Sequence, residues 1–460
     1  MATFRGTDSS GGKPITLTDD TLLAQPDLNV DRSLTVDLDA RLGQPISVTV
    51  PRSSAQQVIA EVAAYTRRPQ GTAGHILLGN SFTTLYSARI GPDSSAEDFF
   101  SIVAGQWART DANGGTDDSP YLYSLFFPEI GRMVHGYQRG VADRELAQVR
   151  ADFGRAQPGT FGRQRVNTGW TDSKVGGFGP SLTFRLPFTR TEYYNTDPGI
   201  ASAGQFQEWS TEGQISDSES AAYTHYSTGR PYHERWNRGV FAPGLSAATS
   251  LSGWRGVTRD GDHLRIDVPR FSDGAGHVGD SSTTRSSATL FRNGTKVADL
   301  DGARLRDVDV EVAPEEAAYR LESHTERGSP FVLSTKTDIA WTFRSGHVPA
   351  TTPTALPLWL IRLSPDVDKD NTVRAGGVRA VPLSITAQPG SAAGKLVSRA
   401  VEASFDDGAT WKAVRVQDGA ALVPHPDGSG FVSLRVKATD NSGTTVELTV
   451  IHAYRFGKTS

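Results

Sequence analysis

Residues Ser404–Val414 read SFDDGATWKAV, and this stretch predicts a β-hairpin. Asp407 and Gly408 form a favoured two-residue turn, because glycine adopts positive φ without steric cost. The carboxylate of Asp406 can accept hydrogen bonds from nearby backbone N–H groups, and Trp411 can cover the turn with apolar surface. Asp406, Gly408 and Trp411 are therefore predicted to be structural residues of a hairpin.

Alternating runs of residues continue on both sides of this hairpin. Between Leu358 and Phe456 the chain contains RAVPLSITAQ, LVSRAVEASFD, TWKAVRV, GFVSLRVKATD and TTVELTVIHAYRF. About seven strands in about 100 residues are typical of an immunoglobulin-like or fibronectin-like sandwich. We expect such a sandwich at the C-terminal end.

The rest of the chain has the same pattern. Runs such as RSLTVDLDA, PISVTVPR, SLTFRLPFTRTEYY, HLRIDVPRF and RDVDVEVA alternate with a period of two. The 47 glycines and 25 prolines also favour turn-rich β structure. Helical spacing at Ser95–Arg109 and Asp143–Arg155 predicts two helices. The expected fold class is mainly β, with tandem β-sandwich domains and a few inserted helices.

Composition divides the chain into four parts. Residues 1–175 are expected to form a β-rich domain that contains both helices, and residues 176–348 a β-sandwich domain with an aromatic cluster. Residues 349–357 read PATTPTALP and predict an extended linker, because closely spaced prolines disfavour helix and remove sheet donors. The C-terminal sandwich then covers residues 358–460.

Charge and composition exclude several classes of partner. The chain has 47 basic and 51 acidic residues, a formal net charge of -4 and no block of like charge, so neither nucleic acid nor a membrane is an expected partner. No apolar run approaches the ~18 to 20 residues of a membrane span, and the N-terminus MATFRGTDSSGG lacks the pattern of a signal peptide. The absence of cysteine excludes disulfides and thiolate metal sites.

Aromatic and charged side chains are densest in RTEYYNTD, residues 190–197, and RPYHERWNRGVF, residues 230–241. Aromatic rings with a polar atom offer a large contact area, so these segments predict a platform that binds sugar or peptide. The alternative is a sheet interface in which buried Tyr and Trp side chains satisfy their own polar atoms. The candidate platform residues are Tyr193, Tyr194, Tyr232, His233, Trp236 and Arg238.

A calcium site is predicted in DVDKDN, where Asp366, Asp368 and Asp370 stand at alternate positions. Carboxylates at this spacing can converge on one hard cation, which makes calcium the candidate cofactor. Asn371 stands where an EF-hand loop has Gly, and Gly377 where it has Glu, so the site would not be an EF-hand. The alternative is a solvated acidic turn.

Local catalytic motifs are scarce. The chain contains neither G-x-S-x-G nor H-E-x-x-H. The peptide GAGHVG satisfies G-x-G-x-x-G through Gly274, Gly276 and Gly279, but loop and strand are predicted after it instead of the helix that holds a pyrophosphate. Asp273 and Asp280 on either side of this loop are interpreted as turn formers.

The hairpin of the opening paragraph also fits the S-x-D-x-G-x-T-W spacing of the Asp-box, a signature common in sialidases. A sialidase propeller would carry several such boxes, and this chain has one. A glycosidase also needs two carboxylates held ~5 to 9.5 Å apart, which the sequence does not identify.

Several stretches occur in an order and at spacings that are specific together. They are LPFTRTEYYNTD, RPYHERWNRGVF, DVPRFSDGAGHVG, AAYRLE with AWTFRSGHV, VEASFDDGATWKAV and GFVSLRVKATDNSGTTVELTVIHAYRF. In these stretches the chain resembles the long non-catalytic C-terminal region of large secreted subtilisin-like serine peptidases (family S8) from actinomycetes. The resemblance implies export to the extracellular space, and an upstream subtilase catalytic domain as a partner in cis or in trans.

The subtilase motifs for the catalytic Asp, His and Ser are missing from the sequence. Acyl transfer needs a nucleophile, a base and oxyanion donors in one site. We therefore expect a non-catalytic accessory region that stabilises, spaces or targets the peptidase, with no catalytic residue of its own. The alternatives are an extracellular module that binds a carbohydrate or protein substrate and, less favoured, an Asp-box glycosidase.

Overall fold

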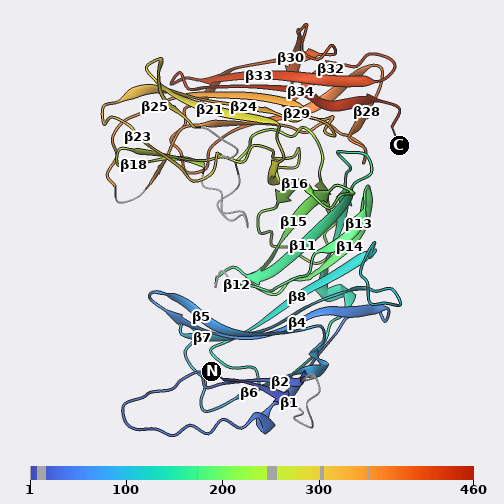
Figure 1. The fold of residues 1–460 in the computed structure, drawn as a ribbon, viewed down its shortest axis with the longest axis vertical. Coiled ribbons are helices and arrows are strands. Elements are labelled where there is room, and N and C mark those ends of the chain that lie inside the picture. Colours follow the sequence, from blue (N-terminus) through green and yellow to red (C-terminus); the bar gives the residue numbers. More distant parts are fainter. Residues whose placement is uncertain are drawn as a thin grey trace.

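The computed structural model describes residues 2–7, 17–172, 175–245, 256–300, 305–350 and 353–459. The chain is mainly β and consists of tandem β-sandwich domains, whose sheets follow one another along the long axis of the molecule (Figure 1). Helix within these ranges is limited to short 3-10 segments at Ala40–Leu42, Phe82–Thr84 and Asp143–Glu145. No helix in the described ranges combines the length and the hydrophobicity that crossing a membrane requires.

The N-terminal lobe packs two sheets against each other. The smaller sheet has the order β1 (Ala2–Thr7), β2 (Leu17–Ala24), β6 (Leu85–Arg89), β3 (Gln44–Thr49) and β9 (Tyr137–Gly140). The larger sheet has the order β17 (Tyr232–Trp236), β10 (Leu146–Phe153), β14 (Phe188–Asn195), β8 (Tyr121–Ile130), β7 (Phe99–Arg109), β4 (Ala55–Arg68) and β5 (Gly71–Gly79). Their shared core includes Leu22, Ile46, Val62 and Tyr123.

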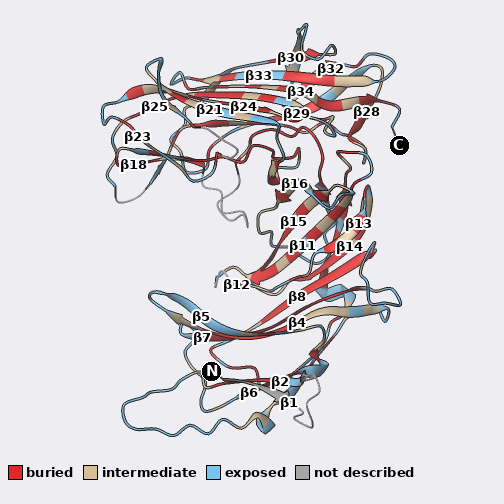
Figure 2. Ribbon diagram, viewed as in Figure 1, coloured by how far each residue is buried: buried red, intermediate tan, exposed pale blue. Residues whose placement is uncertain are grey.

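The prediction of a helix at 95–109 is wrong, because Phe99–Arg109 forms β7. Val103 of this strand faces the core shared with the smaller sheet, whereas Phe100 and Ile102 face a second core on the other side. A strand buried on both faces reads as a continuous apolar run without alternation, and such a run cannot be told from a helix by its period. Figure 2 shows the neighbouring β8 buried along most of its length.

The second predicted helix, at 143–155, is also absent. Asp143–Glu145 makes a 3-10 turn in which the Glu145 carboxylate accepts a hydrogen bond from the Ala142 N–H at 2.7 Å. The chain then enters β10, which pairs with β14 and β17. The acidic residues therefore do mark the start of a helical turn, but this is a single 3-10 turn and no longer helix follows it.

A third sheet lies in the middle of the molecule (Figure 1). Its order is β12 (Val175–Gly176), β11 (Phe161–Trp170), β15 (Ile200–Trp209), β16 (Ile215–Ser220) and β20 (Val278–Ser281), and β13 (Leu182–Arg185) also pairs with β11. Phe184 and Phe206 pack against Phe153 and Trp236 of the larger N-terminal sheet. These aromatic contacts join the middle sheet to the N-terminal lobe.

The C-terminal lobe packs a large β-sheet against a small one. Its main sheet runs β22 (Thr295–Asp299), β21 (Arg285–Arg292), β24 (Ala317–Glu326), β25 (Lys336–Ser345), β34 (Thr445–Gly457), β33 (Gly430–Asp440), β30 (Leu396–Ser404), β31 (Lys412–Gln417), β32 (Ala420–Pro424), β29 (Val378–Ala387) and β27 (Trp359–Leu363). β28 (Thr372–Arg374) also pairs with β34. A small sheet of β23 (Val308–Glu311), β19 (His263–Asp267), β18 (Gly256–Asp260) and β26 (Thr354–Ala355) packs beside it.

Strand pairing crosses the domain boundaries that composition predicts. β10 lies before the boundary at 175 and pairs with β14 and β17 after it. β25 lies before the predicted linker and pairs with β34 near the C-terminus. The linker itself pairs at Thr354–Ala355 with β18, and Leu356 joins the core. Composition cannot reveal such pairings, because the partner strands lie far apart in sequence.

Candidate functional site

A buried polar cluster lies where the middle sheet meets the C-terminal lobe. β16 carries Asp217 and Glu219 two residues apart, so both side chains point to the same face of the strand. β15 places Glu208 directly opposite Asp217 in the antiparallel ladder. All three carboxyl groups are buried. A charge buried in this way requires a partner or a bound proton.

A loop between Phe271 and β20 adds a carboxylate and an imidazole. One oxygen of Asp273 (Oδ1) accepts hydrogen bonds from the backbone N–H groups of Ala275, Gly276 and His277 at 3.0, 2.8 and 2.9 Å. The other oxygen (Oδ2) lies 2.9 Å from His277 Nδ1. Two glycines of the G-x-G-x-x-G motif, Gly274 and Gly276, therefore belong to a loop that wraps around a carboxylate, with Gly276 at a φ of 96°, whereas Gly279 lies in β20.

His277 has two buried neighbours. Its ring stacks on the indole of Trp236 with centroids 3.7 Å apart and an interplanar angle of 7°. Burial lowers the pKa of His277, but the charge of Asp273 and the hydrogen bond to it outweigh burial, and the pKa is raised above its usual value. Asp273 and His277 thus form a buried ion pair while the imidazole is protonated.

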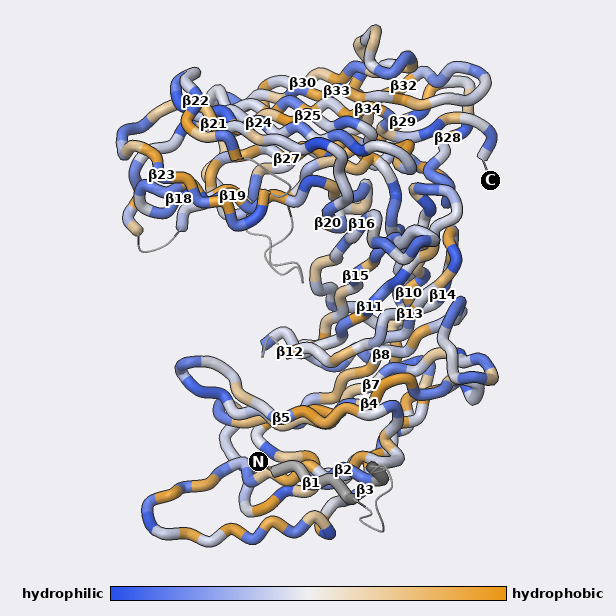
Figure 3. Tube along the Cα trace, in the orientation of Figure 1, coloured by the Kyte–Doolittle hydropathy of each residue, from blue (hydrophilic) through white to orange (hydrophobic). Residues whose placement is uncertain are grey.

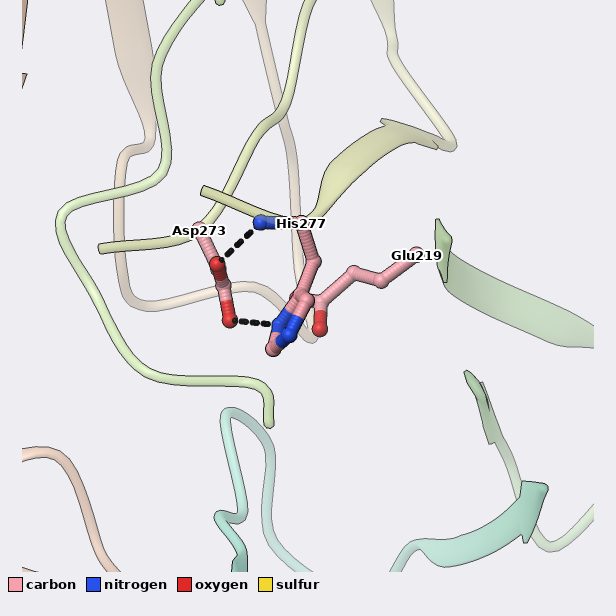
Figure 4. A group of neighbouring side chains, drawn as sticks. All are labelled: Glu219, Asp273 and His277. Carbon is pink, nitrogen blue, oxygen red and sulfur yellow. Dashed lines mark hydrogen bonds and ion pairs between the residues drawn. The ribbon is translucent and has the colours of Figure 1, made fainter. Parts of the chain in front are cut away.

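Glu219 completes the group drawn in Figure 4, in which His277 lies between the two acids. Its Oε2 accepts the Asn237 N–H at 2.9 Å, and its Oε1 has no hydrogen-bond partner among the described residues. Burial and the nearby charge of Asp273 raise the pKa of Glu219 well above its usual value. A neutral Glu219 beside an Asp273–His277 ion pair leaves the group without net charge.

The same three residues could be considered for a metal ion, because one ligand atom from each lies within 4.8 Å of the others. Both Asp273 oxygens are already used by four N–H donors. Only His277 Nε2 and Glu219 Oε1 remain, whereas a closed zinc site takes four ligands. The donor set therefore fits protons better than a divalent cation.

Glu208 and Asp217 are held by the surrounding loops. Glu208 accepts hydrogen bonds from Asn237 Nδ2 at 2.7 Å, from Thr160 Oγ1 and from the Gln157 N–H. Burial, together with the charge of Asp217, raises the pKa of Glu208 to about 7. Asp217 accepts a hydrogen bond from Arg327 at 3.0 Å.

Arg327 connects the cluster to the C-terminal lobe. Its guanidinium also donates to the Ser334 carbonyl at 3.2 Å and to Ser281 Oγ at 3.0 Å. It lies over the rings of Phe271 and Phe331, 4.7 and 4.6 Å from their centroids. Cation–π contacts and hydrogen bonds together compensate for the burial of this charge.

An open cleft of about 510 Å³ borders the cluster on one side. Thr160 and Ser216 line the cleft and are themselves nearly buried, and the fully buried Glu208 hydrogen-bonds to Thr160. The side-chain oxygen of Gln157, another lining residue, has no hydrogen-bond partner among the described residues. The lining is mostly hydroxyl and amide side chains with one aromatic ring, Phe331. A substrate in the cleft could therefore reach hydroxyl groups, but not the Glu208 carboxyl.

The predicted binding platform is a buried interface in the structure. Trp236, Tyr193, Tyr194 and Arg238 are buried, and only Tyr232 and His233 are partly open to solvent. Tyr194 donates to Glu192 at 2.5 Å, and Arg52 donates to Tyr193 at 3.0 Å. Tyr193 and Tyr194 lie on β14 inside the larger N-terminal sheet, and Trp236 is buried on its edge strand β17, so these rings do not form an exposed platform. The alternative reading, in which the rings satisfy their own polar atoms, describes the observed arrangement.

The predicted calcium carboxylates turn toward separate partners. Asp366 is exposed and accepts a hydrogen bond from Arg235 at 2.9 Å. Asp368 Oδ1 accepts the backbone N–H groups of Asp370 and Thr372, each at 2.9 Å. Asp370 bonds to Arg155. The segment is therefore an acidic turn that contacts the N-terminal lobe, and the three carboxylates do not converge.

The Asp-box hairpin forms between β30 and β31. Asp406 Oδ1 accepts a hydrogen bond from Ser404 Oγ at 2.7 Å and from the Thr410 N–H at 2.9 Å. The side-chain hydrogen bonds from Thr410 and Ser404 lower the pKa of Asp406 to about 2. Gly408 has a φ of 87°, and Arg435 lies over the Trp411 ring at 4.8 Å. The contacts of Asp406 are local, and the contact of Trp411 with Arg435 on β33 packs the hairpin onto the sheet.

Comparisons with known proteins do not assign a family. No family model matches the chain, and no curated protein matches it. One solved structure found by the search is "Sidekick-1 immunoglobulin domains 1-4, crystal form 1", with a TM-score of 0.15 and 10% identity over 90% of this chain and 97% of that chain. A similarity this low carries no functional argument, so the site must be interpreted from its own geometry.

Sequence reasoning missed Glu208, Asp217, Glu219 and Arg327. One signal was available: in QFQEWSTEGQISDSES, residues 205–220, two acids stand at alternate positions of one strand, and a further acid, Glu208, stands in the strand before it. The sequence predicts Asp273 only as a turn former. The ion pair with His277 depends on tertiary burial beside Trp236, which lies about forty residues earlier.

Proposed function

We propose that this chain is a non-catalytic accessory region of a secreted subtilisin-like serine peptidase, with structural and spacing roles. The proposed catalytic partner is a subtilase domain, in cis or in trans, in the extracellular space. The link to these peptidases depends on the sequence resemblance. The structure adds a separate argument, which concerns the environment of the Ser, His and Asp side chains that a hydrolase would need.

The proposal that the chain is non-catalytic rests on the environment of His324. Ser287, His324 and Asp338 lie side by side on β21, β24 and β25 and line an open groove of about 310 Å³. His324 Nδ1 lies 2.5 Å from Asp338, and Nε2 lies 3.0 Å from Glu326. Both ring nitrogens are thus engaged by carboxylates, and neither is free to accept a proton from Ser287.

The backbone of this row is used mainly by the sheet. His324 and Asp338 have neighbouring strands on both sides, so their backbone N–H groups are used within the ladders and cannot stabilise a developing oxyanion. Hydrolysis by this triplet would also lack a free base.

The location of the resemblance supports an accessory role as well. The stretches with TRTEYYN and YHERW form β14 and β17, and DVPRFSDGAGHVG contains the loop around Asp273. These segments pack the middle of the molecule and hold the lobes together. A shared sequence in such positions is explained by packing without any catalytic role.

The proposal is tested with a fluorophosphonate probe and with casein as a protein substrate. We expect no covalent labelling and no cleavage by the purified chain. Ser287→Ala is the matched control. Labelling of the wild type that disappears in this variant would overturn the non-enzyme proposal.

A second candidate function, binding of a carbohydrate or protein substrate, is favoured by the hydroxyl-lined cleft beside Glu208. Its only aromatic ring is Phe331, whose contact with Arg327 fixes it at the rim. Retention on insoluble polysaccharides and on immobilised casein tests this function. Phe331→Ala is expected to weaken retention, whereas Phe178→Ala, a change at an exposed ring in another sheet region, is the control. Equal retention of both variants would exclude the cleft.

A further inference from the structure

A segment between β2 and β3, residues 27–38, is exposed and has no strand partner. We call it the free segment. It bends at Asp31–Arg32, and every residue from 27 to 38 is exposed. Among the described residues, no backbone hydrogen bond joins 28–38 to another part of the chain. Figure 1 shows this loop projecting from the N-terminal lobe.

The sequence of the free segment is that of a strand. Apolar side chains recur at alternate positions and are separated by polar residues, as Figure 3 shows for this loop. The large apolar residues in it that are more than a third exposed are Leu28, Val30, Leu34, Val36 and Leu38. Strict alternation normally means that one face of a strand is buried. Here neither the apolar face nor the backbone groups have a partner.

An open sheet edge exists in the same lobe. β5 is the last strand of the larger N-terminal sheet and pairs on one side with β4. Its other side has no partner strand among the described residues. Leu78 of β5 is 48% exposed, although its cross-strand neighbour Glu61 is fully buried. One large apolar side chain, Leu78, is therefore left uncovered at this edge.

The charges of the two elements are complementary. Residues 27–39 contain four aspartates and one arginine. The exposed residues at and beside the β5 edge include Arg68 and His75. Pairing two copies of the free segment with each other would instead bring aspartates together. Charge therefore favours the β5 edge as the partner of the free segment.

We propose that residues 33–38 of one copy add as a strand to β5 of a second copy of this chain. Backbone hydrogen bonds along the edge would supply affinity, and Leu34, Val36 and Leu38 would cover the apolar face beside Leu78. The arrangement is in trans because the free segment is followed and preceded by strands of the smaller sheet, β2 before it and β3 after the 3-10 turn Ala40–Leu42. β5 belongs to the other layer.

Cysteine cross-linking tests this pairing directly, since the chain contains no cysteine of its own. Thr35→Cys and His75→Cys are made as separate variants, both at exposed positions, and circular dichroism verifies their folding. Mixing the two variants under mild oxidation should give a disulfide-linked dimer of one of each. A disulfide forms only where the two Cα atoms come within about 7 Å.

Three outcomes would overturn the proposal. One is the absence of the mixed dimer. Another is a disulfide that forms only inside a doubly substituted chain and is independent of protein concentration, which would mean closure in cis. The third is an equal yield when Thr35→Cys is mixed with a control variant Asn113→Cys, an exposed loop residue elsewhere in the lobe.

Self-association supplies an independent measurement. Thr35→Pro removes a backbone N–H and resists incorporation into a ladder, whereas Thr35→Ala keeps that donor. We expect sedimentation equilibrium to show dimerisation of the wild type and of Thr35→Ala, and association weaker by about tenfold or more for Thr35→Pro. A monomeric wild type at every concentration, or equal association of the two variants, would contradict the pairing.

Discussion

The side-chain amide of Asn371 donates a hydrogen bond to the backbone carbonyl of Asn237 at 3.0 Å, and so joins two turns that are 134 residues apart in sequence. The same amide donates to the Arg155 carbonyl at 3.2 Å, and its oxygen accepts the Gly239 N–H at 2.7 Å. Asn371 is fully buried. One side chain therefore ties the N-terminal lobe, the turn after β17 and the C-terminal lobe together.

Asn371→Asp should destabilise the protein, although aspartate is as large as asparagine and also tolerates the positive φ of 58° at this position. The variant loses the N–H donors to the Asn237 and Arg155 carbonyls and introduces a buried acid. We expect the free energy of unfolding to fall by about 2 to 4 kcal/mol. Urea denaturation followed by tryptophan fluorescence measures the change. Asn113→Asp on an exposed loop is the control, and an equal midpoint for the two variants would refute the role of Asn371.

Stability should fall as pH rises from about 4.5 to about 7. Burial raises the pKa of Glu61 and of Glu208 to about 7, so the folded protein keeps protons that the unfolded chain releases near pH 4.5. Their stabilising contribution is fully present below the unfolded pKa and is lost as pH approaches the folded pKa. The raised pKa of His277 acts in the same direction at higher pH. Thermal unfolding between pH 4.5 and 8 measures the trend.

Glu61→Gln isolates one part of this dependence. The Glu61 oxygen Oε2 accepts the Phe178 N–H at 2.8 Å, and an amide oxygen can replace it. We expect the variant to match the wild type near pH 4.5 and to be more stable by up to about 3 kcal/mol at pH 8. The exposed Glu97→Gln should change neither value. A variant with the same pH slope as the wild type would show that Glu61 does not titrate in this window.

The group of Glu219, Asp273 and His277 should be independent of metal. Burial raises the pKa of Glu219, and Glu219→Gln keeps the acceptor for the Asn237 N–H, so the variant should shift the melting temperature by no more than about 4 °C. Dialysis against EDTA, or addition of calcium or zinc, should leave the wild type unchanged. Stoichiometric metal found by elemental analysis, with a melting temperature that falls after chelation, would reverse this assignment.

Gly204→Ala should destabilise the contact between the middle sheet and β17. A Cβ at Gly204 would lie 2.7 Å from the ring of the fully buried Trp236 and 3.0 Å from Gln164 Nε2. Overpacking of this kind costs about 1 to 3 kcal/mol. Gly140→Ala is the matched control, because its nearest neighbour would be Thr49 Oγ1 at 3.4 Å. Chemical denaturation should separate the two variants, and equal stability would show that the Trp236 ring moves freely.

The parts of the fold that sequence predicts are those fixed by local chemistry. Asp406 and Gly408 define their hairpin through contacts within a few residues, and alternation identifies strands such as β3, β19 and β23. The same reasoning fails for β7. Val103 and Ile102 are buried on opposite faces, so the sequence of this strand does not alternate between apolar and polar residues. The hydrogen bond between Asn371 and Asn237 cannot be predicted from the residues next to either of them in sequence.

The candidate site shows the same division. Asp217 and Glu219 could be placed on one strand face from sequence, but their burial depends on the loop with Asp273 and on Arg327. Tyr194 and Trp236 are residue types suited to ligand binding, but both side chains are buried in the structure. Residues 33–38 have the pattern of a strand, and the structure shows that pattern without its ladder.

The position of β34 has a consequence for biosynthesis. This strand, the last in the described chain, lies between β25 and β33 in the largest sheet. While the polypeptide emerges from the ribosome, β25 and β33 must therefore wait with open edges until residues 445–457 arrive. A nascent chain at that stage presents two long unpaired ladders, and it should depend on chaperone protection far more than the finished protein does.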